Sequence, residues 1–271
     1  MVCRSWYRAF KLPRIWSTFT LGDNTLTRGK FNYHSGWQYV LDHMRTSTCL
    51  NKIGRNIRSL VLEPMLNFYN LYEFMNMISW YTERQGSDNT SVAGVGTHIH
   101  RLKFTFPCNM ANTDDPDNIR VFGTGGKLLE ALKRLMRNLR NLKCLELIDL
   151  MLDNKEALHL MDDICANCTQ TLTKLVLINT TRYYCPLLHV GVFINLNVSC
   201  LSRKACHSSH RFFNLYYLFY AKVLVIGPQN LHEDVIDLIG YTKLEHLHIF
   251  QNRYSQKDAT VRLVIVALVL M

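Results

Sequence analysis

Cysteine and histidine are the residues of this chain whose types and spacing could support zinc binding or redox chemistry. Cys165 and Cys168 form a lone Cys-x-x-Cys pair. A second cluster, with the spacing Cys-x5-Cys-His-x2-His, comprises Cys200, Cys206, His207 and His210. A zinc site needs about four ligands and a redox motif needs its own βαβ setting, while the second spacing fits no common site. We therefore predict buried structural cysteines, and neither a metal nor a cofactor.

Glycines before a helix can cradle a phosphate, and Gly123-Thr124-Gly125-Gly126-Lys127 has that character. A phosphate-binding loop needs G-x-x-x-x-G-K followed by Ser or Thr, but here Leu128 follows the lysine and Val121 replaces the first glycine. The aspartates at 114, 115 and 117 lack the spacing of a calcium loop. With no G-x-S-x-G or H-E-x-x-H motif either, we expect no catalytic residue and predict that the chain is not an enzyme.

The elements that would position any functional group are helices and strands in a repeating order. Residues 127–139 carry a helical stripe of apolar residues, and Leu142-x-x-Leu145-x-Leu147 follows with the step of two that is typical of a strand. The strand pattern recurs from Ile57, Ile99, Leu172 and Leu244. Its middle leucines at 60, 102, 145 and 175 are 42, 43 and 30 residues apart. Regular leucine-rich repeats have periods of roughly 20–29 residues.

A helix–strand unit cannot bury both of its apolar faces alone, so it needs copies of itself stacked alongside. We therefore predict an α/β fold, an irregular leucine-rich-repeat solenoid of helix–strand units over residues 22–271. An ordinary α/β domain with leucine-rich strands is the alternative. Further helices are expected at 70–84, 153–168 and 231–239. We expect one more helix, with these residues on one face: Trp37, Val40, Leu41 and Met44.

Residues 197–221 match neither the helical nor the strand period, although Phe193 to Leu196 start like a repeat strand. Excising this segment would join Leu196 to Lys222 and restore the pattern Leu-x-x-Leu-x-Ile. We interpret 197–221 as an aberrant insertion, such as translated intron sequence or a gene-model error. The apolar tail 261–271 lacks the capping character of a solenoid end, which indicates a second aberrant or truncated segment.

Composition limits the classes of function. The 271 residues are 48% hydrophobic and 19% charged, which fits one sizeable core and not a disordered chain. The net charge is +10, but the nearest basic cluster, at Arg134, Arg137 and Arg140, is typical of a solvated helix side. We do not expect nucleic acid or a membrane as partner. Without a secretory signal or a spanning run, cysteines in apolar runs favour a cytoplasmic or nuclear setting.

Residues 1–21 begin with a helical pattern that Pro13 ends, and they hold two tryptophans. The run VCRSWYRAF, followed by Pro13 and Trp16, resembles the C-terminal part of an F-box, so we expect 1–21 to be the C-terminal remnant of a truncated, partial helical F-box. With the repeats behind it, the chain resembles the F-box proteins with leucine-rich repeats. Within that family, WQYV at 37–40, FGTGGKLLEALKRL at 122–135 and PQN at 228–230 look most like the F-box only protein 33 group and its insect members.

This resemblance implies a substrate-recognition subunit of a Skp–cullin–F-box ubiquitin ligase. It assigns contact with the Skp-type adaptor, and through it a cullin, to Val2, Trp6, Pro13 and Trp16. The repeats would hold a protein substrate for ubiquitination and proteasomal degradation, with Lys143 and Glu146 as outward-pointing candidates. Alternatives are an amphipathic capping helix at 1–21, a leucine-rich-repeat binding module without ligase function and, third, a nucleic-acid-binding protein.

Overall fold

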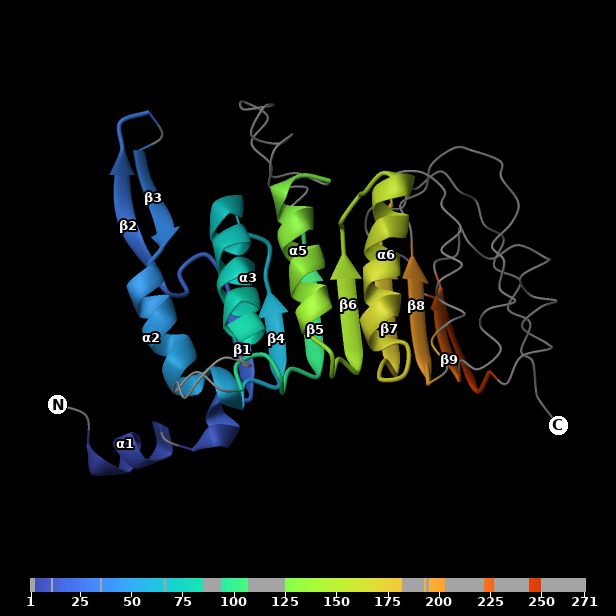
Figure 1. The fold of residues 1–271 in the computed structure, drawn as a ribbon, viewed down its shortest axis with the longest axis horizontal. Coiled ribbons are helices and arrows are strands. Elements are labelled where there is room, and N and C mark those ends of the chain that lie inside the picture. The colour runs from blue at the N-terminus through green and yellow to red at the C-terminus, as the bar shows by residue number, and fades with distance from the viewer. Residues whose placement is uncertain are drawn as a thin grey trace.

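Parallel strands in one long sheet form the frame of the computed structural model (Figure 1). The structure describes residues 3–10, 12–34, 36–65, 67–84, 94–106, 125–181, 193, 195–202, 222–226 and 244–249. The sheet has the order β1-β4-β5-β6-β7-β8-β9-β10, and all its strand pairs are parallel. The strands are β1 (Thr18–Leu21), β4 (Ser59–Leu62), β5 (Arg101–Thr105), β6 (Cys144–Ile148), β7 (Lys174–Ile178), β8 (Val198–Ser202), β9 (Val223–Ile226) and β10 (His246–Ile249). The chain is therefore mixed α/β.

Helices cover one face of this sheet, as Figure 1 shows for α3, α5 and α6. The helices after β1 are α2 (His43–Ile53), α3 (Phe68–Glu83), α5 (Lys127–Asn138) and α6 (Asn154–Cys168), with a 3-10 turn η2 (Gly54–Asn56). Side chains fix where three of them begin, and at α2 Asp42 accepts the N–H groups of Met44 and Arg45. Asn67 accepts the Tyr69 N–H at the start of α3, and Asp153 and Glu156 form a capping box at the start of α6. The predicted helices at 70–84, 127–139 and 153–168 are thus confirmed.

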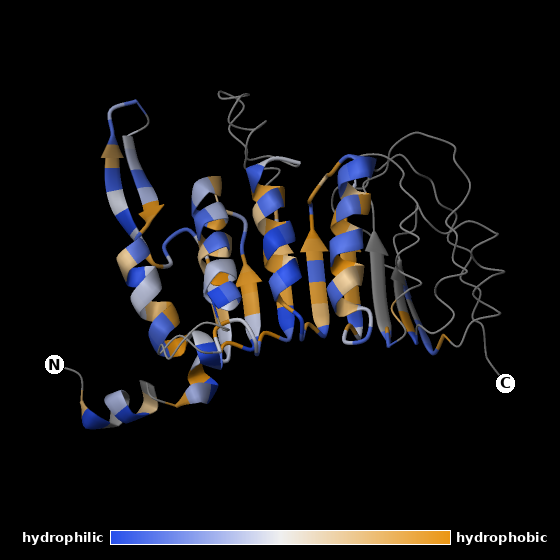
Figure 2. Cartoon of the chain, in the orientation of Figure 1, coloured by the Kyte–Doolittle hydropathy of each residue, from blue (hydrophilic) through white to orange (hydrophobic). Residues whose placement is uncertain are grey.

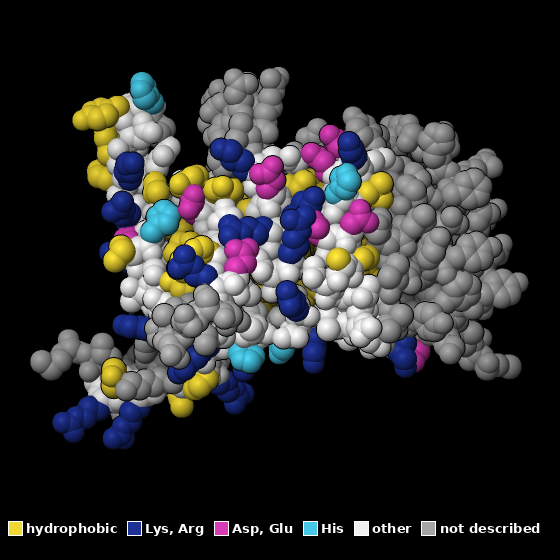
Figure 3. All heavy atoms as spheres, in the orientation of Figure 1, with side chains coloured by type: hydrophobic (Ala, Val, Ile, Leu, Met, Phe, Trp, Pro, Cys, Tyr) yellow, Lys and Arg dark blue, Asp and Glu magenta, His cyan; other side chains and the backbone are white. Residues whose placement is uncertain are grey.

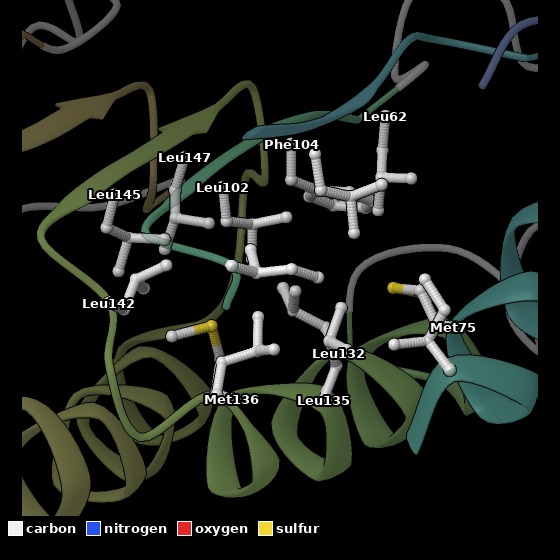
Figure 4. Packing of buried hydrophobic residues seen from close by; sticks show 14 of the residues in the cluster. Leu62, Met75, Leu102, Phe104, Leu132, Leu135, Met136, Leu142, Leu145 and Leu147 are labelled. Atoms are coloured by element: carbon white, nitrogen blue, oxygen red, sulfur yellow. The ribbon is translucent and has the colours of Figure 1, made fainter. Parts of the chain in front are cut away.

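The core lies between the helices and the sheet (Figure 4). Strand registers align the middle residues of successive repeat patterns, so Leu60, Leu102, Leu145 and Leu175 form one row. All four are 0% exposed. Figure 4 shows Leu132, Leu135 and Met136 of α5 facing the strand leucines, and Met75 of α3 beside them. Figure 2 shows that the strands are mostly hydrophobic and that the helices turn hydrophilic residues outward. Each helix–strand unit thus completes the core of its neighbour.

Between β1 and α2 in the sequence lies a two-stranded antiparallel hairpin, β2 (Thr27–Asn32) and β3 (Gly36–Leu41). It projects away from the main sheet (Figure 1). The prediction of a helix with Trp37, Val40, Leu41 and Met44 on one face is therefore wrong. Trp37 and Met44 are 76% and 77% exposed, and α2 begins only at His43. Apolar residues at 37, 39 and 41 also satisfy a period of two, and Gly36 takes the positive φ of 74° that the turn requires.

Two segment boundaries also differ from the prediction. Residues 18–21 form β1, so the last part of the expected F-box remnant belongs to the main sheet. Val198–Ser202 forms β8 between β7 and β9. The prediction that 197–221 contains no strand is therefore wrong for the first residues of that segment. Ser199 lies in register with Leu175, and a serine at that middle position hid the pattern Leu196-x-x-Ser199-x-Leu201. The origin of 197–221 stays a prediction.

Several predictions fall outside the described residues: the remainder of the insertion, the helix at 231–239, the aspartates at 114–117 and the tail 261–271. Within the described part, no helix is both long and apolar enough to cross a bilayer.

Candidate functional site

The sheet face opposite α3, α5 and α6 presents a row of charged side chains. Residues on this face alternate with the buried leucines, so Arg101 and Lys103 of β5, Glu146 of β6 and Lys174 of β7 share it. Their strands are neighbours, which brings Glu146 beside cations that lie 28 to 45 residues away from it in the sequence. We call these four residues the charged row.

Glu146 is the centre of the charged row. Arg101 Nη2 donates to Glu146 Oε1 at 2.9 Å, and Lys174 Nζ lies 3.4 Å from the same oxygen. The Cys144 thiol donates to this oxygen at 3.6 Å, and burial is the main reason why the pKa of that thiol is raised. Glu146 is only 7% exposed, whereas the side chains of Arg101 and Lys174 are about half exposed. The charged row therefore contains one carboxylate and three cations, and its net charge is positive.

The two substrate candidates from the sequence have different surroundings. Glu146 does lie on the face opposite α3, α5 and α6, but its carboxylate is largely covered by its two cationic neighbours. Lys143 is exposed and precedes β6, and its carbonyl oxygen accepts the N–H groups of Thr173 and Lys174. Arg101, Lys103 and Lys174 were not singled out from the sequence, because only the strand register brings them beside Glu146.

Glu146→Gln is expected to lower the free energy of unfolding by about 1 kcal/mol, because Arg101 and Lys174 would keep their charges without a counter-ion while remaining partly solvated. Urea unfolding followed by circular dichroism measures the loss. Lys143→Gln, at an exposed position directly before β6, is the matched control and should stay within about 0.5 kcal/mol of the wild type. Equal stability of both variants would show that the ion pairs contribute nothing.

The helix-covered side carries paired charges. Arg134 of α5 donates to both oxygens of Glu83 at 2.6 and 2.9 Å, and this guanidinium holds the pKa of Glu83 below its usual value. Arg137 and Lys133 lie 2.9 and 3.5 Å from the two oxygens of Asp163 on α6. Figure 3 shows the resulting mixture of basic and acidic side chains over these helices. The basic cluster seen in the sequence is thus largely neutralised, as expected for a solvated helix side.

Cys168 is buried and Cys165 is half-buried, and of the glycine loop the structure describes Gly125, Gly126 and Lys127. Burial raises the pKa of Cys165 and of Cys168 to about 11, so both are thiols at neutral pH. Among the described residues, no group of three or more His, Cys, Asp or Glu could hold a metal. Gly125 has a φ of 81°, and a Cβ there would collide with the Glu156 carboxylate. A carboxylate this close to Gly125 disfavours the binding of a phosphate there.

One pocket lies between α5 and the ends of β5 and β6, and only apolar side chains line it: Phe104, Phe106, Leu128, Leu129, Leu132, Leu150 and Leu152. Among the described residues, its lining offers no polar side chain for catalysis or for orienting a polar ligand.

The N-terminal segment consists of α1 (Arg4–Phe10) and the 3-10 helix η1 (Pro13–Trp16), which leads directly into β1. Trp16 packs against the core. It lies three residues before Phe19, as Ile57 lies three residues before Leu60, and Phe19 pairs with Leu60 in the sheet. Pro13 is exposed at the start of η1. Of the other adaptor candidates, Trp6 lies within α1, and Val2 is outside the described residues.

Apolar side chains on this N-terminal segment are exposed, and the sequence alone did not single them out. Tyr7, Leu12 and Ile15 are 58%, 56% and 52% exposed. Figure 1 shows α1 standing apart from the helix layer, next to the amino ends of the strands. Contiguous exposed apolar patches are typical of surfaces that bind another protein, and these three side chains are candidates for such a patch.

Comparison with known proteins adds no assignment: the chain matches no protein-family model and no curated protein sequence.

Proposed function

We propose that this chain is the substrate-recognition subunit of a Skp–cullin–F-box ubiquitin ligase. In this proposal α1 and η1 dock the Skp-type adaptor, which links the chain to a cullin in the cytoplasm or nucleus. The repeat array, an irregular leucine-rich-repeat solenoid, holds a protein substrate for ubiquitination and proteasomal degradation. The chain itself performs no chemistry, and its role is to bring substrate and ligase together.

The observation that carries the proposal is the exposed apolar surface of the N-terminal segment. Tyr7, Leu12 and Ile15 lie beside the positions that the F-box resemblance assigns to adaptor contact, Trp6, Pro13 and Trp16. A segment that packs on an adaptor leaves such side chains exposed when the adaptor is absent. The in-register rows of the sheet support the second half of the proposal, because a stack of helix–strand units is the architecture of leucine-rich repeats.

On the substrate side, the proposal uses the charged row. Strand side chains that point away from the helices form a continuous surface, and parallel strands hold them at fixed spacing. Arg101, Lys103 and Lys174 give that surface a positive charge, which suits a substrate segment rich in acidic residues.

Ile15→Asp is expected to abolish co-purification with the Skp-type adaptor, with at least about a tenfold loss of captured adaptor, because it places a charge in an apolar interface. Thr18→Asp is the matched control: it adds the same charge three residues later, at an exposed position of β1. Co-expression with tagged adaptor and quantitative gel analysis give the readout, and thermal melting confirms that both variants are folded.

Adaptor captured equally by Ile15→Asp and by wild type would contradict the proposed contact surface. Failure of the wild-type chain and of both variants to bind would favour the alternative function, a leucine-rich-repeat protein-binding module without ligase activity.

A further inference from the structure

The hairpin β2–β3 displays aromatic side chains on one of its faces. Phe31 pairs with Trp37 and Gly29 pairs with Tyr39, so these four positions share one face. The rings of Phe31 and Trp37 are 5.5 Å apart in an edge-to-face arrangement, and Tyr33 adds a second such contact to Phe31 at 5.6 Å. The exposed fractions of these aromatic residues are 50% for Phe31, 94% for Tyr33, 76% for Trp37 and 58% for Tyr39. We call this the aromatic face of the hairpin.

The opposite face of the same hairpin is basic. Arg28 and Lys30 alternate with Gly29 and Phe31 along β2, so they point to the other side. Both are exposed, and their cross-strand neighbours are Val40 and Gln38. A strand that pairs with β2 would therefore contact aromatic rings with every second side chain and cations with the side chains between.

The backbone of β2 has a free edge. The Asp42 N–H donates to the Leu26 carbonyl at 2.8 Å, and hydrogen-bonded pairs alternate along an antiparallel ladder. The N–H and C=O groups of Thr27, Gly29 and Phe31 therefore point away from β3. The Thr27 carbonyl accepts from Arg45 Nη1 at 3.5 Å, which agrees with this direction. No hydrogen bond within the described part of the chain reaches the outward groups of Gly29 and Phe31.

The outer edge of β3 is occupied instead. Its Tyr39 carbonyl accepts from the side chains of Asn67 and Asn70, and its Leu41 N–H donates to Asn70 Oδ1. The outward groups of Tyr39 and Leu41 on β3 are therefore taken by α3, whereas those of Gly29 and Phe31 on β2 are available for a further strand.

The geometry favours protein over single-stranded nucleic acid as the occupant of this edge. Base stacking needs flat ring faces next to the cations that neutralise phosphates. Here the rings interlock edge to face, and Arg28 and Lys30 project from the opposite side. A β-strand, by contrast, presents different side chains to two faces at once, and it supplies the backbone groups that an open edge lacks.

We propose that β2 binds an extended segment of a partner protein, in which apolar and acidic residues alternate, by strand addition at the Gly29–Phe31 edge. The apolar side chains pack on the aromatic face, the acidic side chains pair with Arg28 and Lys30, and Gly29 and Phe31 supply the backbone hydrogen bonds. The cations on the edge select an acidic strand and repel basic ones. This surface is separate from the charged row and does not depend on the proposed ligase function.

Gly29→Pro tests strand addition directly. Proline removes the outward N–H of Gly29, keeps the aromatic face, and is tolerated on a strand edge whose N–H faces solvent. Gly29→Ala is the matched control, because it keeps the N–H and its Cβ would lie 3.7 Å from the Trp37 ring, an ordinary contact. The probe is a short synthetic peptide that alternates valine with aspartate, titrated into the full chain and followed by hydrogen exchange of β2. Thermal melting of both variants checks folding.

We expect wild type and Gly29→Ala to bind the peptide with equal affinity and to protect the Phe31 amide, and Gly29→Pro to bind about fivefold more weakly or not at all. The double variant Arg28→Glu with Lys30→Glu should lose the valine–aspartate peptide and bind a valine–lysine peptide instead. No binding by wild type, equal binding by Gly29→Pro, or an unchanged preference in the charge-reversed variant would each overturn the proposal. Saturation of the hairpin by an oligouridine probe, by anionic vesicles or by a second copy of the chain would assign it another occupant and also overturn it.

Discussion

Leu145→Ala is expected to lower the free energy of unfolding by about 2–5 kcal/mol, the largest effect on stability that we predict. Leu145 is 0% exposed and lies in the middle of the leucine row, between Leu102 and Leu175. Alanine would leave a cavity that the neighbouring strands cannot close, because each is held in register by its own ladder.

Urea unfolding followed by circular dichroism measures this loss. Lys143→Ala, two residues earlier and exposed, is the control and should change stability by about 0.5 kcal/mol or less. A loss below about 1 kcal/mol for Leu145→Ala would mean that the leucine row is not packed as described.

Asn70→Ala is expected to cost about 2–3 kcal/mol and to loosen the base of the hairpin. Asn70 is 0% exposed; its Oδ1 accepts the Leu41 N–H at 2.8 Å, and its Nδ2 donates to the Tyr39 carbonyl at 2.9 Å. Alanine would remove the partner of a buried backbone N–H, whose desolvation would then be uncompensated.

Hydrogen exchange at Leu41 is the most specific measurement for this variant, with thermal melting beside it. Asn67→Ala is the comparison: Asn67 caps α3 and also donates to Tyr39, but at 3.2 Å and at an exposed position, so about 1 kcal/mol is expected. Unchanged exchange at Leu41 in Asn70→Ala would show that α3 does not hold the hairpin through this side chain.

Apolar periodicity predicted the α/β character of the fold and several of its units. The strand pattern Leu-x-x-Leu-x-Leu was missed where other residue types occupy its leucine positions. Trp16 and Phe19 occupy the first two positions of the pattern in β1, and Ser199 occupies the middle position in β8. Apolar periodicity also failed at Trp37, because a short run can satisfy the periods of a helix and of a strand together.

The candidate sites were less predictable than the fold. Glu146 was identified as outward-pointing, but its burial depends on Arg101 and Lys174, which other strands supply. Nothing local to Glu146 in the sequence carries that information. The free edge of β2 depends on which pairs of the hairpin are hydrogen-bonded and on Asn70 from a distant helix, and neither is visible in sequence spacing.

The most direct test of the proposed ligase role is a calorimetric titration of purified Skp-type adaptor into this chain, beside a longer form in which a complete F-box precedes Val2. The account predicts saturable one-to-one binding by both forms and loss of that binding when Ile15→Asp is introduced into either. Absence of binding by both forms, with each shown to be folded, would contradict the account and leave the repeat array as a binding module without a ligase.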